Sequence, residues 1–327
     1  MLDIFHPIWK LKIAENPKLF SIISQLWQAA YNNDNEYYHE ENKATTETTT
    51  NSNLTTSPPK TNNDKFPLPF GNFPYNKGFI YLDRIGYRIP TKLSDEIGNN
   101  NESKKKKKHP KSLQRSLTPH LDCCPTTIIE NNYSNVSKWR PFQSFIALTD
   151  TIEPNTGGFE AVPGFHLQFE SWARNRKNTI TKGKNNTIRE KAAPCLGEFT
   201  PIRPKEDIDV IKQMKHIPCK AGSFVIWDVR IPHANSLYNT SNNVCRSVVY
   251  TSFLPDISIN RQYALERQLN LYKEKRKMTD QWIANDVIED EEDYAFSTLG
   301  KFLMGLDDWD RLSDYEIDNL HLCDENI

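Results

Sequence analysis

The sequence lacks the features of a membrane-spanning, secreted or strongly charged protein. No apolar run approaches the roughly 18 residues that span a bilayer. Residues 1–10 lack the basic start and apolar core of a secretory signal. The 41 basic and 42 acidic residues nearly cancel, so no overall charge favours nucleic acid or a membrane surface. We therefore expect a cytoplasmic protein without nucleic-acid or membrane partners.

Cysteine is sparse and irregularly spaced. The six cysteines stand at positions 123, 124, 195, 219, 245 and 323, and this spacing matches no disulfide framework. In a chain of 327 residues we expect them to be reduced thiols. Cys123 and Cys124 follow a candidate ligand pair described below. There they either pack as small side chains, which we favour, or bind a soft metal.

Three tracts contain too few apolar residues to build a core. They are rich in Asn, Lys and Thr and lie at about 43–64, 98–112 and 175–193. The segments between them are rich in aromatic residues. We therefore interpret the tracts as low-complexity loops inserted into a single domain, residues 1–327. The run Lys104–Lys108 matches a nuclear-localisation signal in composition, although a solvated insertion also explains it.

Hydrophobic periodicity predicts a mainly β protein with flanking helices. Apolar residues at helical spacing predict helices over 16–31 and 258–275. The segment 77–90 is typical of a strand, and we expect a bend at Gly86. Further short strands are predicted at 116–122, 126–130, 142–149, 215–219, 223–228 and 245–253. Short strands with helices mostly at the two ends favour an antiparallel sandwich or jelly roll.

The candidate chemistry begins with His120-Leu121-Asp122. Residues i and i+2 of a strand project to the same face, so His120 and Asp122 can bind one ion together. A second histidine, His233, follows the buried strand at 223–228 after a short loop. Two histidines and one carboxylate, with open positions on the metal, are the ligands of non-haem Fe(II) oxygenases. His-X-Asp alone also arises by chance, and His233 is otherwise an ordinary loop histidine.

A cation is expected beside this ligand set. The strand predicted at 245–253 begins near Arg246, which would share a face with Val248 and Tyr250. A guanidinium pairs with a carboxylate through two parallel hydrogen bonds, which suits one end of a dicarboxylic acid. The alternative is a structural salt bridge.

Two longer segments reveal a family resemblance. FIALTDTIEPNTGGFEAVPGFH (145–166) and GSFVIWDVRIPHANSLYNTSNNVCRSVVY (222–250) resemble the phytanoyl-CoA dioxygenase-like branch of the Fe(II)/2-oxoglutarate-dependent dioxygenases. The resemblance covers much of 16–31 and 77–255. It implies a double-stranded β-helix (jelly roll). It also implies an enzyme that uses Fe(II), O₂ and 2-oxoglutarate to hydroxylate a small organic molecule, releasing succinate and CO₂.

The resemblance also assigns roles by position. His120, Asp122 and His233 would be the catalytic iron ligands, and Arg246 would bind the distal carboxylate of 2-oxoglutarate. The other residues expected near the co-substrate are Gln143, Phe145 and Asn235. Phe165 departs from the family pattern because a small serine is usual in that turn, and Asn235 stands where some relatives have serine. These departures affect the fine geometry of the site and remove no ligand.

Two other functions stay open at this point. A catalytically silent jelly-roll module would bind a ligand or partner without turnover. A cupin-like hydrolase or isomerase would use another metal and leave Arg246 without its role. The substrate and the oligomeric state are not predicted, because loops determine specificity and these loops carry little signal. The lysines of 175–193 suggest an anionic substrate, but only weakly.

Overall fold

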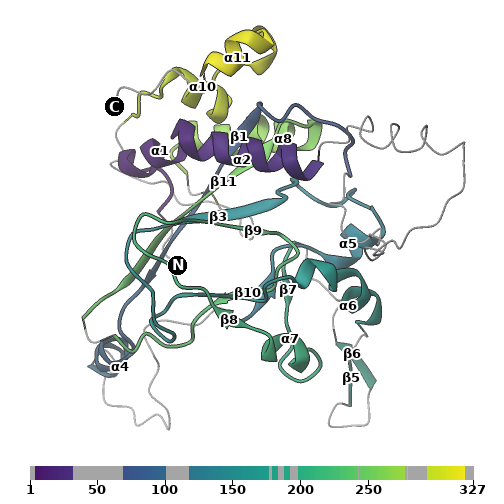
Figure 1. Cartoon of the computed structure of the whole chain (residues 1–327), viewed down its shortest axis with the longest axis vertical. Helices are drawn as coiled ribbons and strands as arrows, with labels where there is room; N and C mark the ends of the chain where they lie inside the picture. The colour runs from purple at the N-terminus through teal and green to yellow at the C-terminus, as the bar shows by residue number, and fades with distance from the viewer. Residues whose placement is uncertain are drawn as a thin grey trace, which may run out of the picture.

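The computed structural model describes residues 4–31, 69–100, 118–176, 179–182, 188–191, 198–241, 243–276, 278 and 293–320. These residues form two antiparallel sheets, with a layer of helices over one of them (Figure 1). The predicted sheet-rich architecture with flanking helices is therefore confirmed. The run Lys104–Lys108 and the tract 43–64 lie outside the described residues.

The first sheet has four strands in the order β1-β11-β3-β9. Their bounds are β1 Gly78–Arg88, β11 Arg246–Pro255, β3 Phe142–Ala147 and β9 Phe224–Asp228. All three pairings are antiparallel. Because β1 and β11 pair along most of their lengths, the register places Arg88 directly opposite Arg246.

The second sheet has five short strands in the order β7-β2-β10-β4-β8. Their bounds are β7 Thr200–Pro201, β2 His120–Leu121, β10 His233–Asn235, β4 Phe159–Ala161 and β8 Lys215–His216. The described neighbours again pair antiparallel. Two further strands, β5 Thr179–Lys182 and β6 Ile188–Lys191, form a separate hairpin.

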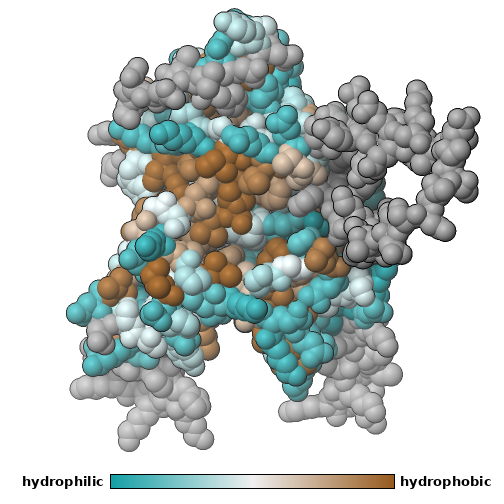
Figure 2. Space-filling view, in the orientation of Figure 1, coloured by the Kyte–Doolittle hydropathy of each residue, from teal (hydrophilic) through white to brown (hydrophobic). Residues whose placement is uncertain are grey.

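Helices cover the outer face of the four-stranded sheet (Figure 1). They include α1 Ile8–Ala14, α2 Pro17–Tyr31, the continuous helical segment α8 Ser258–Gln262, η3 Tyr263–Gln268 and α9 Leu269–Lys273, and α10 Thr298–Met304. One hydrophobic core joins them to the sheet, with Phe20 of α2 packed against both Trp27 of the same helix and Phe253 of β11. In Figure 2, apolar side chains gather in the middle of the side of the molecule that faces the viewer, below a band of hydrophilic side chains.

A second hydrophobic core fills the space between the two sheets. Phe145 of β3 and Trp227 of β9 come from the four-stranded sheet, and Leu121 of β2 and Phe159 of β4 come from the five-stranded sheet. Shorter elements contribute to this second core: α5 Pro125–Ile129, η2 Phe165–Leu167, α6 Phe169–Asn175 and α7 Ile208–Lys212. Helix α4 Thr91–Asn100 follows β1. The remaining described elements are η4 Trp309–Arg311 and α11 Asp314–Leu320.

Most predicted elements are confirmed, one is wrong and two are shorter than predicted. The helices at 16–31 and 258–275 and the strands at 142–149, 223–228 and 245–253 are present within a few residues. The strand predicted at 126–130 is wrong, because these residues form α5. Pro125 stands at the first helical position, where its fixed φ favours a helix. The predicted strands at 116–122 and 215–219 shorten to β2 and β8.

The irregularity in β1 lies three residues before its predicted place. The register shifts between Leu82 and Ile85, whereas the sequence predicted the bend at Gly86. Gly86 serves a different purpose. A Cβ built there would lie 2.9 Å from Nη1 of Arg246 and 2.7 Å from a methyl of Val248, so only glycine leaves room for this guanidinium.

Two predicted loops contain regular structure. The tract at 98–112 begins inside α4, which ends at Asn100. The tract at 175–193 includes the hairpin of β5 and β6, so its prediction as a plain loop is wrong. None of the helices in the described ranges is both long and apolar enough to cross a bilayer. The cytoplasmic location stays a prediction.

Candidate metal centre

The sheet pairing brings the two candidate histidines together. His233 of β10 lies directly opposite His120 of β2 in the register of the five-stranded sheet. Asp122 follows the end of β2 in a bend. Its Oδ1 lies 3.5 Å from Nε2 of His120, and its Oδ2 lies 3.6 Å from Nε2 of His233. The three donor atoms all lie within 4.8 Å of one another, close enough to share one ion.

Backbone carbonyls orient both imidazole rings. Nδ1 of His120 lies 2.9 Å from the carbonyl oxygen of Thr118, and Nδ1 of His233 lies 3.0 Å from that of Ile231. A carbonyl only accepts, so each Nδ1 carries a proton, which leaves Nε2 as the ring atom available to a metal. Such a bond on the far nitrogen is the usual way in which a protein fixes a metal-binding histidine.

The pKa values favour ligands in their metal-binding forms. Burial lowers the pKa of His120 to about 4, helped by the nearby His233 and opposed by the Asp122 charge. His120 is therefore neutral at pH 7. Burial raises the pKa of Asp122, but the nearby imidazoles of His233 and His120 and the Arg140 guanidinium outweigh it. The net effect is a pKa far below the ordinary value, so Asp122 is a carboxylate.

A buried glutamine holds the carboxylate. Nε2 of Gln143 on β3 donates to Oδ2 of Asp122 over 2.7 Å, and Gln143 is only 2% exposed. The sequence predicted that Gln143 contacts the co-substrate, whereas the structure shows a contact with a candidate ligand. Its Oε1 has no partner among the described residues.

We predict that Gln143→Leu weakens metal binding by roughly 10- to 100-fold, the usual effect of losing an outer partner of a ligand. Leucine keeps most of the volume but cannot donate to Asp122. Competitive metal titration measures the change, and Gln25→Leu at an exposed position of α2 is the matched control. Equal affinity in wild type and Gln143→Leu would contradict the orienting role.

Arg246 lies between the sheets with unused hydrogen-bonding capacity. The residue is only 3% exposed, and its Nη2 has no partner among the described residues. Its guanidinium carbon lies 5.5 Å from the centre of the Phe145 ring. No described carboxylate forms an ion pair with it, so the structural salt bridge considered above is not present there.

A second buried arginine, Arg88, was missed by the sequence reasoning. It stands opposite Arg246 in the β1–β11 pairing and is 9% exposed. One Nη donates to the carbonyl of Leu237, and Nε has no partner among the described residues. Burial and the charge of Arg246 lower the pKa of Arg88. Two buried guanidinium groups therefore face each other across neighbouring strands.

Aromatic rings connect this arginine pair to the histidines. Phe145, which touches the Arg246 guanidinium, lies 5.4 Å from Phe159 and 5.8 Å from Trp227 between ring centres. Those two rings lie 5.8 Å and 5.1 Å from the ring of His233. The arginine pair and the metal ligands therefore face the same inter-sheet space.

Further polar groups in this space lack partners. Nε1 of Trp227, Oδ1 of Asn235 and Oγ of Ser236 are buried without a hydrogen bond among the described residues. The amide of Asn235 donates to the hydroxyl of Tyr250 over 3.4 Å. Because buried polar groups are nearly always satisfied, such a cluster indicates a place for a polar ligand.

The cysteine prediction is wrong at one position. Cys124 is disulfide-bonded, whereas Cys123, Cys219 and Cys245 are free thiols. Burial raises the pKa of the Cys123 thiol. A buried, protonated thiol is a poor metal ligand, so Cys123 fits the packing role that the sequence favoured.

Part of this chain is similar in sequence to a known protein family. Residues 135–247 match the family model of phytanoyl-CoA dioxygenase (PhyH). A Dictyostelium discoideum protein named "Putative phytanoyl-CoA dioxygenase" is 29% identical over 133 residues, which are 41% of this chain and 32% of that protein. The match thus spans about a third of the relative's length.

Solved structures share the fold at low identity. A hypothetical protein from Escherichia coli superposes with a TM-score of 0.57 at 15% identity, over 93% of this chain and 70% of that one. The GlcNAc Inducible Gene 2 protein from Candida albicans gives a TM-score of 0.51 at 15% identity, over 76% and 62%. These likenesses concern the fold alone.

The matched region contains His233 and Arg246 but begins after His120 and Asp122. The first two candidate ligands therefore rest on the geometry of this structure. The predicted resemblance itself is confirmed: residues 135–247 of this chain match the phytanoyl-CoA dioxygenase family model, and the chain is similar to a relative of that name.

Proposed function

We propose that this chain is a non-haem Fe(II) oxygenase that consumes 2-oxoglutarate and O₂, built as one domain around a double-stranded β-helix. The topology supports this fold. Strands β1, β2, β3 and β4 alternate between the two sheets, and β8, β9, β10 and β11 alternate again. Two face-to-face antiparallel sheets with this alternation are the arrangement of a jelly roll.

The donor set fits iron. His120, Asp122 and His233 offer two imidazole nitrogens and one carboxylate, the facial set of non-haem Fe(II) oxygenases. The observation that carries the proposal is the pair of Nδ1 contacts with backbone carbonyls, which turn both Nε2 atoms towards Asp122. Ordinary core histidines have no need for such a shared orientation.

The arginine pair fits the distal carboxylate of 2-oxoglutarate. An unpaired buried guanidinium is costly unless a ligand supplies the counter-charge, and Arg246 and Arg88 together present two such groups. Phe145 packs against Arg246 and would exclude water from that carboxylate. Roles in binding the co-substrate are proposed for Arg246, Arg88 and Phe145, with Asn235 as a further polar contact.

Bound iron with O₂ and 2-oxoglutarate supplies an oxidation that inserts oxygen into a C–H bond of a small organic substrate and leaves succinate and CO₂. The chain's own tasks are positioning and exclusion. Thr118 and Ile231 hold the imidazoles through their carbonyls, and Gln143 holds Asp122. The arginine pair would orient the co-substrate from the other side of the inter-sheet aromatic rings.

Succinate formation tests the proposed function. The purified chain, with Fe(II), ascorbate, air and 2-oxoglutarate, should form succinate even without its substrate, and neither anaerobic nor Zn(II)-loaded protein should do so. No succinate under any of these conditions, together with no thermal stabilisation by 2-oxoglutarate, would sink the proposal. A catalytically silent binding module would instead keep the stabilisation without turnover. A hydrolase or isomerase that uses another metal would neither be stabilised by 2-oxoglutarate nor form succinate from it.

A further inference from the structure

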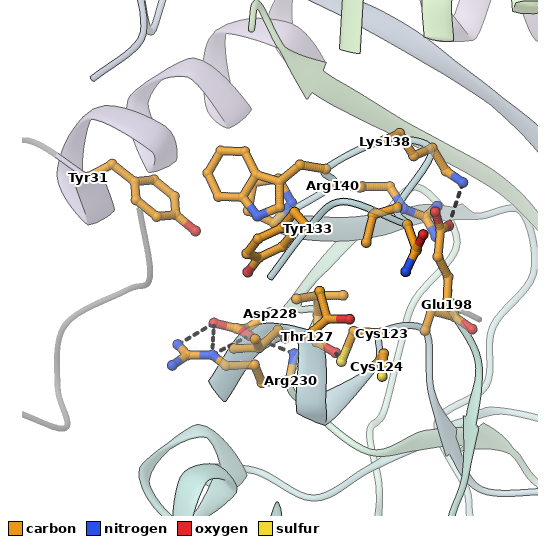
Figure 3. A pocket seen from close by; sticks show the side chains of 17 residues that line it. Tyr31, Cys123, Cys124, Thr127, Tyr133, Lys138, Arg140, Glu198, Asp228 and Arg230 are labelled. Carbon is orange, nitrogen blue, oxygen red and sulfur yellow. Dashed lines mark hydrogen bonds and ion pairs between the residues drawn. The ribbon is translucent and has the colours of Figure 1, made fainter. Parts of the chain in front are cut away.

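A cavity of about 270 Å³ opens beside Asp122 (Figure 3). Aromatic side chains line one side of it, namely Tyr31 of α2, Tyr133 and Trp139. The ring centres of Tyr31 and Trp139 are 5.5 Å apart. Thr127 of α5 contributes to the lining from another side.

This cavity is separate from the region proposed for the co-substrate. Neither Arg246 nor Phe145 lines it, whereas Asp122 does. The same carboxylate lies within 3.6 Å of Nε2 of His233. A molecule in the cavity would therefore approach the metal ligands without displacing the co-substrate.

Two ion pairs neutralise charges in the lining. Nζ of Lys138 lies 2.7 Å from Oε2 of Glu198, and the Arg230 guanidinium bonds both carboxylate oxygens of Asp228 at 2.7 to 3.2 Å. Figure 3 shows these pairs on different sides of the cavity. Each is already satisfied, so an ionic ligand would have to break one of them.

The third cation of the lining, Arg140, also faces carboxylates. Its Nη1 lies 3.5 Å from Asp83, its Nη2 lies 4.0 Å from Asp122, and the guanidinium stacks 4.4 Å from the ring centre of Tyr81. The lining therefore contains three cations and three anions, Lys138, Arg140, Arg230, Asp122, Glu198 and Asp228. Its formal charges cancel, which favours an uncharged ligand because transferring an ion from water is costly.

One polar group in the lining lacks a partner. The hydroxyl of Tyr133 is buried and forms no hydrogen bond with any described residue. Its ring packs at 5.3 Å from that of Phe70, which fixes its direction. Burial raises the pKa of Tyr133 well above its ordinary value, so the hydroxyl stays protonated and can either donate or accept one hydrogen bond.

The volume limits the size of the ligand. An apolar cavity of about 150 Å³ holds benzene, and drug-sized pockets begin at about 300 Å³. A cavity of about 270 Å³ therefore accommodates one ring with a short substituent. The adjacent aromatic side chains favour stacking with such a ring.

Resting on the proposed oxygenase function, we infer that this cavity binds the substrate. That substrate is an uncharged, largely apolar molecule about the size of one substituted ring, held by the Tyr133 hydroxyl. This differs from the anionic substrate that the lysines of 175–193 suggested. The inference also gives the paired charges of the lining a role, because an ionic ligand would have to break one of these pairs whereas an uncharged ligand would not.

Three probes that share one ring but differ in charge test the inference: benzyl alcohol, benzoate and benzylamine. Ligand-observed NMR on the full chain, with Zn(II) as a diamagnetic substitute for iron, should detect benzyl alcohol. Benzoate and benzylamine should bind at least about tenfold more weakly. Tyr133→Phe should weaken benzyl alcohol by roughly 2- to 10-fold. The control Tyr315→Phe, at a side chain that is 77% exposed, should leave the affinity for benzyl alcohol unchanged.

A filling substitution locates the binding. Val136→Trp projects into the cavity and should abolish the benzyl alcohol signal, whereas Val244→Trp at a 52% exposed position outside the lining should keep it. Equal or tighter binding of benzoate, no detectable benzyl alcohol, or binding that both Val136→Trp and Tyr133→Phe leave intact would overturn the inference. This binding needs no turnover. Absent succinate with intact probe binding would therefore refute the oxygenase function and leave the cavity assignment standing.

Discussion

Replacing Asp122 by asparagine is expected to abolish Fe(II) binding and reduce succinate formation to background. Asparagine keeps the shape of the side chain but removes the only anionic donor of the set. The loss of metal affinity should exceed about 100-fold, which is the largest usual effect of mutating a residue that only hydrogen-bonds to a ligand. Here the ligand itself is removed. An amide oxygen can still accept the hydrogen bond from Gln143. The metal-free fold should therefore change in stability by about 1 kcal/mol or less.

Metal-dependent unfolding separates these two effects. At a metal concentration of 100 Kd, a bound ion stabilises the wild type by about 2.7 kcal/mol, and Asp122→Asn should lose this increment entirely. Asp209→Asn is the matched control, since that carboxylate is exposed on α7. Wild-type iron content and rate in Asp122→Asn would show that the ligand assignment is wrong. His120→Ala should fail in the same way.

The grouping of the three candidate ligands was predictable because each lies beside a recognisable local pattern. His120 and Asp122 are two residues apart, and His233 follows a buried strand. The strand argument was only half right, however, because β2 ends at Leu121 and Asp122 lies in the following bend. The carboxylate reaches the histidines by that bend and is held by Gln143 from the other sheet. A sequence pattern can indicate that these three side chains lie close together, but it cannot specify the backbone conformation that brings them there.

Local propensity failed where two signals competed. The β-branched residues after Pro125 favoured a strand, but proline at the first helical position favoured α5, and the helix formed. The hairpin of β5 and β6 shows the opposite failure. A polar composition predicted a loop there, whereas pairing between the two segments makes regular structure.

The binding cavity and Arg88 were beyond sequence reasoning for a physical reason. Arg88 acquires its role only through the register between β1 and β11, which joins residues about 160 positions apart in the chain. The cavity likewise combines α2, α5, the end of β9 and several loops, and its charges cancel through pairs such as Lys138 with Glu198. These pairings are tertiary, and no periodicity within one segment encodes them.

Replacing Arg246 by methionine is expected to weaken 2-oxoglutarate binding strongly while stabilising the free protein. Truncating one partner of a buried charge pair costs about 2–5 kcal/mol, roughly 30- to several-thousand-fold in affinity. The free protein, in contrast, holds Arg246 beside Arg88 without a described carboxylate to neutralise either one. An apolar side chain of similar length removes an uncompensated buried charge, and comparable replacements gain about 1–4 kcal/mol.

The opposite signs make the test decisive. Calorimetric titration measures the affinity for 2-oxoglutarate, and urea unfolding without the co-substrate measures stability. A structural ion pair at Arg246 would predict a destabilisation of about 3–5 kcal/mol on removal of one partner, and that result would refute the anion-binding role. Arg174→Met, at an exposed pair on α6, should affect neither quantity by more than about 0.5 kcal/mol. Like Arg246→Met, the variant Arg88→Met should weaken 2-oxoglutarate binding and stabilise the free protein. The double variant should lose less affinity than the two single losses added together, because both guanidinium groups would serve one carboxylate.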